Sequence, residues 1–236
     1  MAVYSRTYKF VYFQNPRTGS TMLETVLIKE LGGELIPIPK NHAEKMRYKH
    51  LTYFELLGTG VISRRELDSM FLFTSVRNPY DKAVSDWQGE KKFYQKSRTP
   101  EKRPENVLAH RTTNLEDYLK LVLLLRLPLR LRFAIYRYLP VIAFNFLAAL
   151  YGFGRRMNRN SFTIDKMNLY IRNKNIESDF QEFLSKIGVN RVVKLPIINR
   201  TENRTQDYES YQTVNTRRWL RKMYSDIFDR FYPDLE

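Results

Sequence analysis

Short apolar runs alternate along this chain with stretches of helical periodicity, a pattern typical of an α/β protein. Four runs are rich in aromatic and branched apolar residues and predict buried strands: 9–13, 34–38, 70–76 and 191–195. We expect these runs to form a central, mainly parallel sheet flanked by helices.

The stretches between these runs predict helices. The first helix follows the strand at 9–13, and its apolar positions share one face: Leu23, Val26, Leu27 and Leu31. Gly32 and Gly33 should end it. Amphipathic patterns predict further helices at 179–187 and 214–231. The segment 88–111 has many charges and no apolar period, and it predicts an exposed loop.

Polar residues follow the strand at 70–76 in an informative order. Arg77 stands at its carboxyl end, which is where open α/β sheets bind ligands. Asn78 can cap a helix that begins at Pro79, and Ser85 then lies in the early turns of that helix. An arginine and a hydroxyl so placed can bind a dianionic phosphate. The alternative is an arginine that only satisfies the strand end.

A second polar segment follows the strand at 9–13. It runs through five candidate ligand-binding residues, Arg17, Thr18, Gly19, Ser20 and Thr21, into the amino terminus of the first helix. Backbone N–H groups and the helix dipole converge there, so the segment predicts an anion site. It lacks the Gly-x4-Gly-Lys-Ser/Thr spacing of nucleotide-triphosphate loops.

Together these two segments resemble the cofactor motifs of sulfotransferases that use 3′-phosphoadenosine 5′-phosphosulfate, and most closely the group that acts on carbohydrates. The resemblance covers roughly residues 9–117 and 162–232. It implies a P-loop-like three-layer fold in which residues 1–236 form a single domain. It also implies that residues 17–21 bind the 5′-phosphosulfate, and that Arg77 and Ser85 bind the 3′-phosphate.

Such an enzyme needs a base to take the proton of the acceptor hydroxyl. His50 is our candidate because its segment resembles the histidine segment of these enzymes, whereas His42 and His110 lie outside it. Glu55 is a lesser candidate. Arg17 stands where the family usually has lysine; it can stabilise charge on the leaving phosphate, but it does not donate a proton.

Composition indicates which partners and which cellular compartment suit this chemistry. The net charge of +15 calls for anionic partners, and no RNA-binding aromatic signature, helix-turn-helix or zinc finger points to nucleic acid. The chain has no cysteine and three scattered histidines, so we expect neither a disulfide nor a metal site. A cysteine-free chain fits the reducing cytoplasm, and a strand that begins near residue 9 leaves no room for a signal peptide.

The segment 118–157 predicts an apolar helical insertion that the resemblance does not cover. Tyr138–Gly154 contains no charged residue, but Pro140 and Asn145 interrupt it, and it is shorter than the about 20 residues that span a bilayer. Arginines recur in the stretch before it. Three interpretations stay open: core helices, helices on a membrane surface, and a membrane span. The segment is also our candidate for acceptor recognition.

The predicted function is transfer of a sulfuryl group to a hydroxyl of a carbohydrate or glycolipid, without a metal, in the cytoplasm and with peripheral membrane contact through 118–157. Three other classes remain open. A kinase would need a loop lysine and a metal-binding acid. A binding module would hold the nucleotide without transfer. A membrane-surface protein would bind anionic vesicles and ignore the nucleotide.

Overall fold

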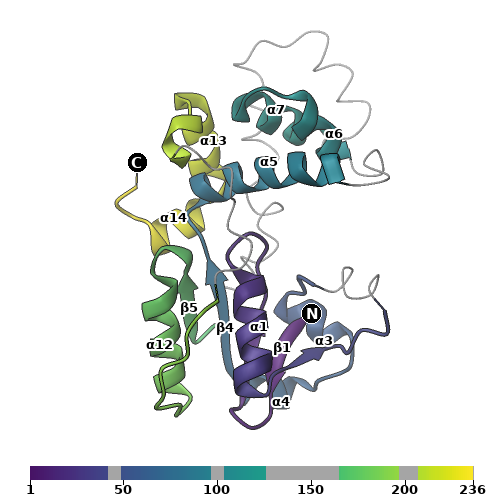
Figure 1. Cartoon of the computed structure of the whole chain (residues 1–236), viewed down its shortest axis with the longest axis vertical. Helices are drawn as coiled ribbons and strands as arrows, with labels where there is room; N and C mark the ends of the chain where they lie inside the picture. The colour runs from purple at the N-terminus through teal and green to yellow at the C-terminus, as the bar shows by residue number, and fades with distance from the viewer. Residues whose placement is uncertain (42–48, 97–103, 126–164, 197–206, 236) are drawn as a thin grey trace. The chain divides into compact units, whose positions relative to one another are not determined.

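The computed structural model describes residues 1–41, 49–96, 104–125, 165–196 and 207–235 (Figure 1). They belong to two compact units, one made of Met1–Arg77 and Arg159–Asn203 and the other of Asn78–Asn158 and Arg204–Glu236. The prediction of a single domain over 1–236 stays a prediction. Most of the predicted insertion at 118–157, from residue 126 on, lies outside the described residues.

The first unit is built on a five-stranded sheet in the order β3-β1-β2-β4-β5. Its strands are β1 (Ala2–Ser5), β2 (Phe10–Phe13), β3 (Glu34–Ile36), β4 (Phe71–Val76) and β5 (Leu169–Arg172). β1 is antiparallel to both of its neighbours, whereas β2, β4 and β5 are parallel. Four strands therefore run in one direction, and the α/β class with a mostly parallel sheet is confirmed.

The strands confirm three of the four predictions and correct the fourth. The runs at 9–13 and 70–76 form β2 and β4, and 34–38 contributes β3, which ends before Pro37 because proline has no N–H for the sheet. The run at 191–195 is not a strand: the side chain of Gln181 donates to the Val193 carbonyl at 3.1 Å, and none of the five described strands pairs with this segment. β1 and β5 were not predicted.

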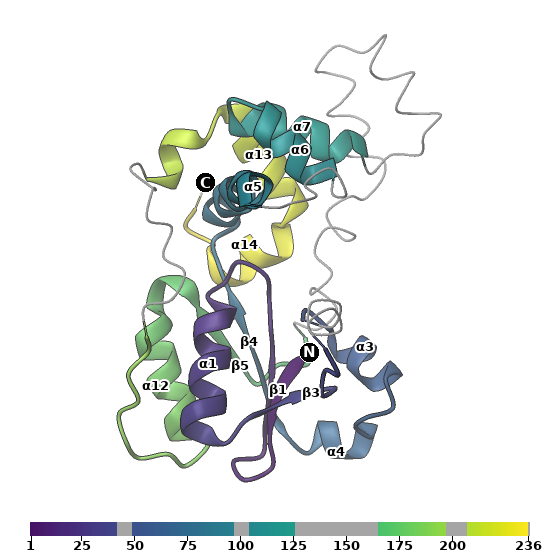
Figure 2. The same ribbon diagram turned by 45° about the vertical axis from the view of Figure 1, so that its right-hand side comes forward.

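Alternating side chains of the sheet supply two cores, one on each face. One face packs against α1 (Ser20–Leu31) and α12 (Ile176–Lys186), and its strand residues are Val3, Phe10, Tyr12, Phe73 and Ile171. The other packs with residues of α3 (Tyr53–Gly58) and α4 (Arg64–Asp68) around Ala2, Tyr4, Val11, Phe13 and Leu72. Figure 2 shows these helix pairs on opposite sides of the sheet. The unit thus has three layers.

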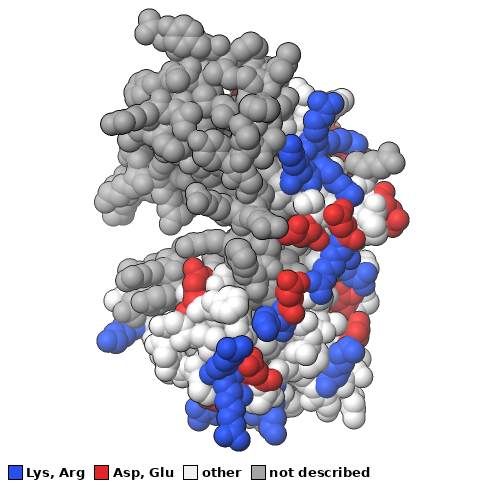
Figure 3. Space-filling view, turned by 180° about the vertical axis from the view of Figure 1, so that it is seen from behind, with Lys and Arg blue, Asp and Glu red and all other residues white. Residues whose placement is uncertain are grey.

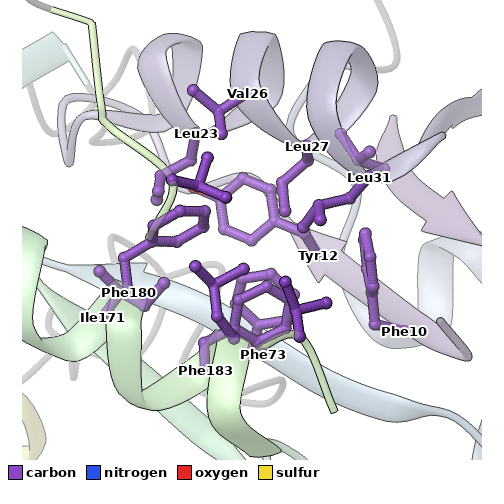
Figure 4. Close-up of a cluster of buried hydrophobic side chains, with 14 residues drawn as sticks. Phe10, Tyr12, Leu23, Val26, Leu27, Leu31, Phe73, Ile171, Phe180 and Phe183 are labelled. Atoms are coloured by element: carbon purple, nitrogen blue, oxygen red, sulfur yellow. The ribbon is translucent and has the colours of Figure 1, made fainter. Parts of the chain in front are cut away.

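Aromatic rings fill the core between α1 and α12 (Figure 4). Phe183 of α12 stacks on Phe73 of β4 with 4.0 Å between ring centroids, and it meets Phe10 edge to face at 5.4 Å. The predicted apolar face of α1 packs here, and its four residues are at most 4% exposed. α1 ends as predicted at Gly32, whose φ of 57° suits glycine and whose N–H bonds to the Leu27 carbonyl.

The described part of the second unit is helical. Its elements are α5 (Pro79–Lys96), α6 (Pro104–Arg111), α7 (Leu115–Leu125), the short 3-10 helix η3 (Tyr208–Tyr211), α13 (Val214–Met223) and α14 (Ser225–Phe231). Asn78 caps α5, because its Oδ1 accepts from the Tyr80 N–H at 2.9 Å as predicted. The ring of Tyr80 packs on Phe228 of α14 at 4.7 Å between centroids.

Two predictions for this unit are wrong. The segment 88–111 is mainly helical where it is described, because Glu, Lys and Gln are strong helix formers and buried Trp87 donates to the hydroxyl of Thr112 at 3.2 Å. The helix expected at 214–231 is two helices, since Tyr224 at φ −123° and ψ 30° ends α13. Trp219, Tyr224 and Phe228 of this segment are buried, whereas Phe231 is half-buried.

Candidate functional site

The candidate site lies at the carboxyl ends of β2 and β4. These neighbouring strands are parallel, so the loop after β2 and the residue after β4 reach the same edge of the sheet. Nη1 of Arg77 donates to the carbonyl oxygen of Arg17 at 3.0 Å. The two segments that the sequence singled out, 60 positions apart, thus meet within the first unit.

A chain of buried hydroxyls connects the loop to β4, and its direction can be derived. Thr18 Oγ1 donates to the Asn15 carbonyl at 2.9 Å, so its single proton is used there. Ser75 Oγ, 2.6 Å away, must then donate to Thr18, and the Tyr12 hydroxyl, 2.7 Å from Ser75, must donate to Ser75. Burial raises the pKa of Tyr12, which keeps this donor protonated.

Two asparagine side chains connect the loop to β4 and to the segment after β5. Nδ2 of Asn15 donates to the Ser75 carbonyl at 2.8 Å, and Nδ2 of Asn173 in η2 (Asn173–Asn175), just beyond β5, donates to the Thr18 carbonyl at 3.3 Å. Neither Ser75 nor Asn173 was among the predicted site residues. The sequence does mark Ser75 as a residue that needs a partner, because a polar side chain in a mostly apolar strand must form a hydrogen bond when it is buried.

The backbone of the loop is shaped for an anion. Arg17 and Gly19 both have positive φ, 63° and 87°, and no side chain caps the amino terminus of α1. Left-handed residues among right-handed ones turn successive N–H groups to one side, and an uncapped helix end adds further donors. A Cβ at Gly19 would lie 3.1 Å from Ile176 Cδ1, so glycine also lets α12 approach.

The side chains of the loop divide into structural and accessible ones. Thr18 and Ser20 are 3% and 6% exposed, and the hydroxyl of Thr18 is committed to the loop, so a ligand would meet its N–H rather than its side chain. Arg17 is exposed. Thr21 is half-buried, and its hydroxyl accepts from Lys49 Nζ at 3.4 Å.

His50 lies against the same loop. Its Nδ1 is 3.0 Å from the carbonyl oxygen of Gln14, and because a carbonyl only accepts, Nδ1 must carry the proton of the neutral ring. Nε2 is then the basic nitrogen. Glu55 has a structural role: it completes the capping box of α3, with Oε2 accepting from the Thr52 N–H at 2.9 Å.

Gln14 is a residue of this site that sequence reasoning missed. Its side chain is 1% exposed, and neither amide atom has a hydrogen-bond partner within the described ranges. An unsatisfied buried amide is costly, and ligands or water usually satisfy such groups. Gln14 follows β2 directly and starts the loop, so its amide adds a donor and an acceptor to the candidate site.

The other candidate residues are not part of the described first unit. Ser85 is half-buried on α5 in the second unit, so its joint role with Arg77 stays a prediction. His110 is exposed and stacks on Tyr94 with 4.2 Å between ring centroids. His42 lies outside the described residues.

Over the described part of the chain, no three His, Asp or Glu side chains are grouped so as to hold a metal ion, and no helix there is both long and apolar enough to span a bilayer. On the face shown in Figure 3, basic and acidic side chains are interspersed. The chain matches no family model, no curated protein and no solved structure.

Proposed function

We propose that this protein is a sulfotransferase that moves a sulfuryl group from 3′-phosphoadenosine 5′-phosphosulfate to a hydroxyl of a carbohydrate or glycolipid. The contact between Arg77 and the Arg17 carbonyl carries the proposal, because it joins the two segments that resemble the cofactor motifs. The three-layer arrangement around β2 and α1 is compatible with the P-loop-like fold that this resemblance implies.

The residues present suit the two charged ends of the donor nucleotide. The N–H groups of the loop and the guanidinium of Arg17 would bind the 5′-phosphosulfate, since the loop is held by Ser75 and Asn173 before any ligand arrives. Arg77 would bind the 3′-phosphate, and the part of Ser85 on α5 stays a prediction. Arginine suits this task because its planar fork matches phosphate oxygens in pairs.

In the reaction, the bond between sulfur and the donor's phosphate oxygen breaks while a bond forms between sulfur and the acceptor oxygen. Nε2 of His50 would accept the proton of the acceptor hydroxyl. The hydrogen bond from Nδ1 to the Gln14 carbonyl would hold the ring in the tautomer that this requires. Arg17 would stabilise the charge that develops on the leaving phosphate, and that phosphate would leave without receiving a proton from it.

Calorimetry with adenosine 3′,5′-bisphosphate tests the binding half of the proposal. Arg77→Ala should weaken binding by about tenfold or more, because a charge-assisted hydrogen-bond pair contributes about 1.5–3 kcal/mol. Arg64→Ala is the matched control, since Arg64 is exposed and pairs with Asp68 on the same helix α4. Failure of the unmodified protein to bind the bisphosphate would overturn the proposal.

Incubation with labelled sulfate donor and a panel of glycans, glycolipids and small alcohols tests the transfer half. Labelled product is the expected result. Tight nucleotide binding without product on any acceptor would favour the non-catalytic binding module, for which the arginine at position 17 would be the cause. Phosphate transfer from ATP that depends on magnesium would favour the kinase instead.

The setting of this activity is part of the same proposal. We expect a cytoplasmic enzyme whose segment 118–157 contacts the acceptor or a membrane surface. Sedimentation of the protein with anionic vesicles, compared with neutral ones, measures that contact.

A further inference from the structure

The second unit contains a cavity that the proposed function does not use. It has a volume of about 380 Å³ and is lined by Tyr80, Arg217, Arg218, Arg221, Pro233 and Leu235. All six residues belong to the second unit, so its geometry does not depend on the first. Its volume is in the range of pockets that bind small molecules.

Three arginines of α13 give this cavity its chemistry. Arg217, Arg218 and Arg221 occupy positions i, i+1 and i+4 of one helix, so their side chains leave it on neighbouring sides. The lining includes no acidic residue. A cavity with three guanidinium groups and no carboxylate favours a ligand with several negative charges.

Arg221 is already fixed in place. Its Nη2 donates to Asp229 at 3.0 Å, its Nη1 donates to the Leu235 carbonyl at 3.2 Å, and its guanidinium lies 4.8 Å from the ring centroid of Phe228. Arg217 and Arg218 differ from it, because in the described part of the chain neither has a carboxylate partner. Arg221 is therefore held in position, whereas Arg217 and Arg218 have no ion-pair partner among the described residues.

The hydroxyl of Tyr80 is an independent indication that this cavity binds a ligand. Tyr80 is 3% exposed, and its buried hydroxyl has no hydrogen-bond partner among the described residues. Burial raises the pKa of this phenol, with the charges of Arg221 and Arg217 opposing the rise, so the hydroxyl keeps its proton at neutral pH and lies within the field of these arginines. A protonated hydroxyl beside cations lacks an acceptor, and an anionic oxygen is the acceptor that such surroundings favour.

We infer that this cavity is a second anion site, separate from the loop after β2, and that it binds a small organic ester carrying two or more phosphate or sulfate groups. Arg217 and Arg218 would supply paired N–H donors, and Tyr80 would donate its hydroxyl. The ester could be a soluble molecule or the headgroup of a lipid, because both present the same charged oxygens.

Calorimetry of the full chain with inorganic pyrophosphate tests the inference. To weaken binding at the first site, the titration uses the Arg77→Ala protein. The double variant R217A/R218A in that background should bind pyrophosphate at least about tenfold more weakly. Lys222→Ala is the matched control: it removes one cation from the same helix, but Lys222 does not line the cavity.

Two further variants separate a ligand role from a structural one. Tyr80→Phe keeps the ring against Phe228 and removes only a hydroxyl that has no described partner, so it should weaken pyrophosphate binding while leaving the melting temperature unchanged. R217K/R218K keeps the charges and loses the planar forks, and it should show intermediate affinity. Equal pyrophosphate affinity in R217A/R218A and Lys222→Ala would overturn the inference, as would affinity that follows net charge alone.

Vesicles identify the source of the ester. Phosphatidylcholine vesicles with and without a lipid that carries phosphomonoester groups are sedimented with the Arg77→Ala protein and with its R217A/R218A derivative. Sedimentation that needs both the phosphomonoester lipid and the two arginines assigns the site to a headgroup. Pyrophosphate binding without such sedimentation assigns it to a soluble ester. The first site can fail in its own bisphosphate assay without affecting either result.

Discussion

At the scale of single residues, His50 gives the sharpest test of catalysis. His50→Ala should lower turnover by a factor of about 100 or more while leaving bisphosphate affinity unchanged, because a general base acts on the acceptor proton and not on the nucleotide. Initial rates at saturating donor, measured beside calorimetry, check this. His110→Ala is the control, since His110 is exposed and stacks on Tyr94. Unchanged turnover in His50→Ala would exclude His50 as the base.

The single-residue view also explains why the loop needs residues that bind nothing themselves. The Thr18 hydroxyl donates to the Asn15 carbonyl. Ser75 donates to Thr18, and Tyr12 donates to Ser75. Three hydroxyls pointing one way polarise one another. The loop is thereby held in a conformation that presents its N–H groups without help from a ligand.

At the scale of elements, the junction of the loop with α1 depends on Gly19. Gly19→Ala should destabilise the protein by about 1–2 kcal/mol from its left-handed backbone alone, and by more because the new Cβ meets Ile176 and Asn173 at 3.1 and 3.3 Å. Gly32→Ala is the matched control. Gly32 also has positive φ, but nothing lies within 4 Å of its Cβ position. Denaturant unfolding measures both; equal losses would exclude the contact with α12.

A second element-scale test concerns the start of α12. Asp179 is 3% exposed and accepts three hydrogen bonds from Arg172, one from its backbone N–H and two from its guanidinium. Asp179→Asn should destabilise the protein by about 1.5–3 kcal/mol, because the buried side chain loses its charge-assisted hydrogen bonds with the half-exposed guanidinium of Arg172.

Glu182→Gln is the control for that substitution. Its partner Lys186 lies 3.5 Å away on the same helix, both side chains are about half exposed, and such surface pairs contribute about 0–1 kcal/mol. Chemical denaturation of both variants gives the comparison. A loss in Asp179→Asn no larger than in Glu182→Gln would show that the buried pair does not hold β5 to α12.

At the scale of the whole molecule, the helices and strands that were predicted correctly are those with a clear apolar pattern in their own sequence. β2, β4, α1 and α12 have strong apolar patterns, and each lies close to its expected position. β1 and β5 are short, and they become strands through pairing with β2 and β4, which no local pattern reports. The run at 191–195 has the composition of a strand but pairs with no strand in the described part of the chain.

Some residues of the candidate site were likewise predicted from the local sequence, and others were not. Arg17, Gly19 and Arg77 were predicted from their positions after strands, where the edge of a parallel sheet collects them. Gln14 and Asn173 were not, because their importance comes from burial and from contacts across the sheet, such as the bond from Asn173 to the Thr18 carbonyl. Long-range partners of this kind are set by tertiary packing.

Alkaline pH should destabilise the whole molecule through its tyrosines. Burial raises the pKa of five phenols above their ordinary value: those of Tyr4, Tyr12, Tyr53, Tyr80 and Tyr208. In the unfolded chain these phenols lose their protons near pH 10, whereas the folded chain keeps them, so the unfolded state binds fewer protons and stability falls as pH rises. Below about pH 9 the tyrosines should contribute no slope.

Each retained proton should cost about 1.4 kcal/mol of unfolding free energy per pH unit above pH 10. Urea unfolding at a series of pH values measures that slope, and phenolate absorbance of the folded protein reports directly whether the protons are kept. Tyr12→Phe should remove about one proton from the slope, because Tyr12 is fully buried in the core under α1. A slope that is the same in Tyr12→Phe and in the unmodified protein would mean that the Tyr12 phenol ionises as readily in the core as in the unfolded chain.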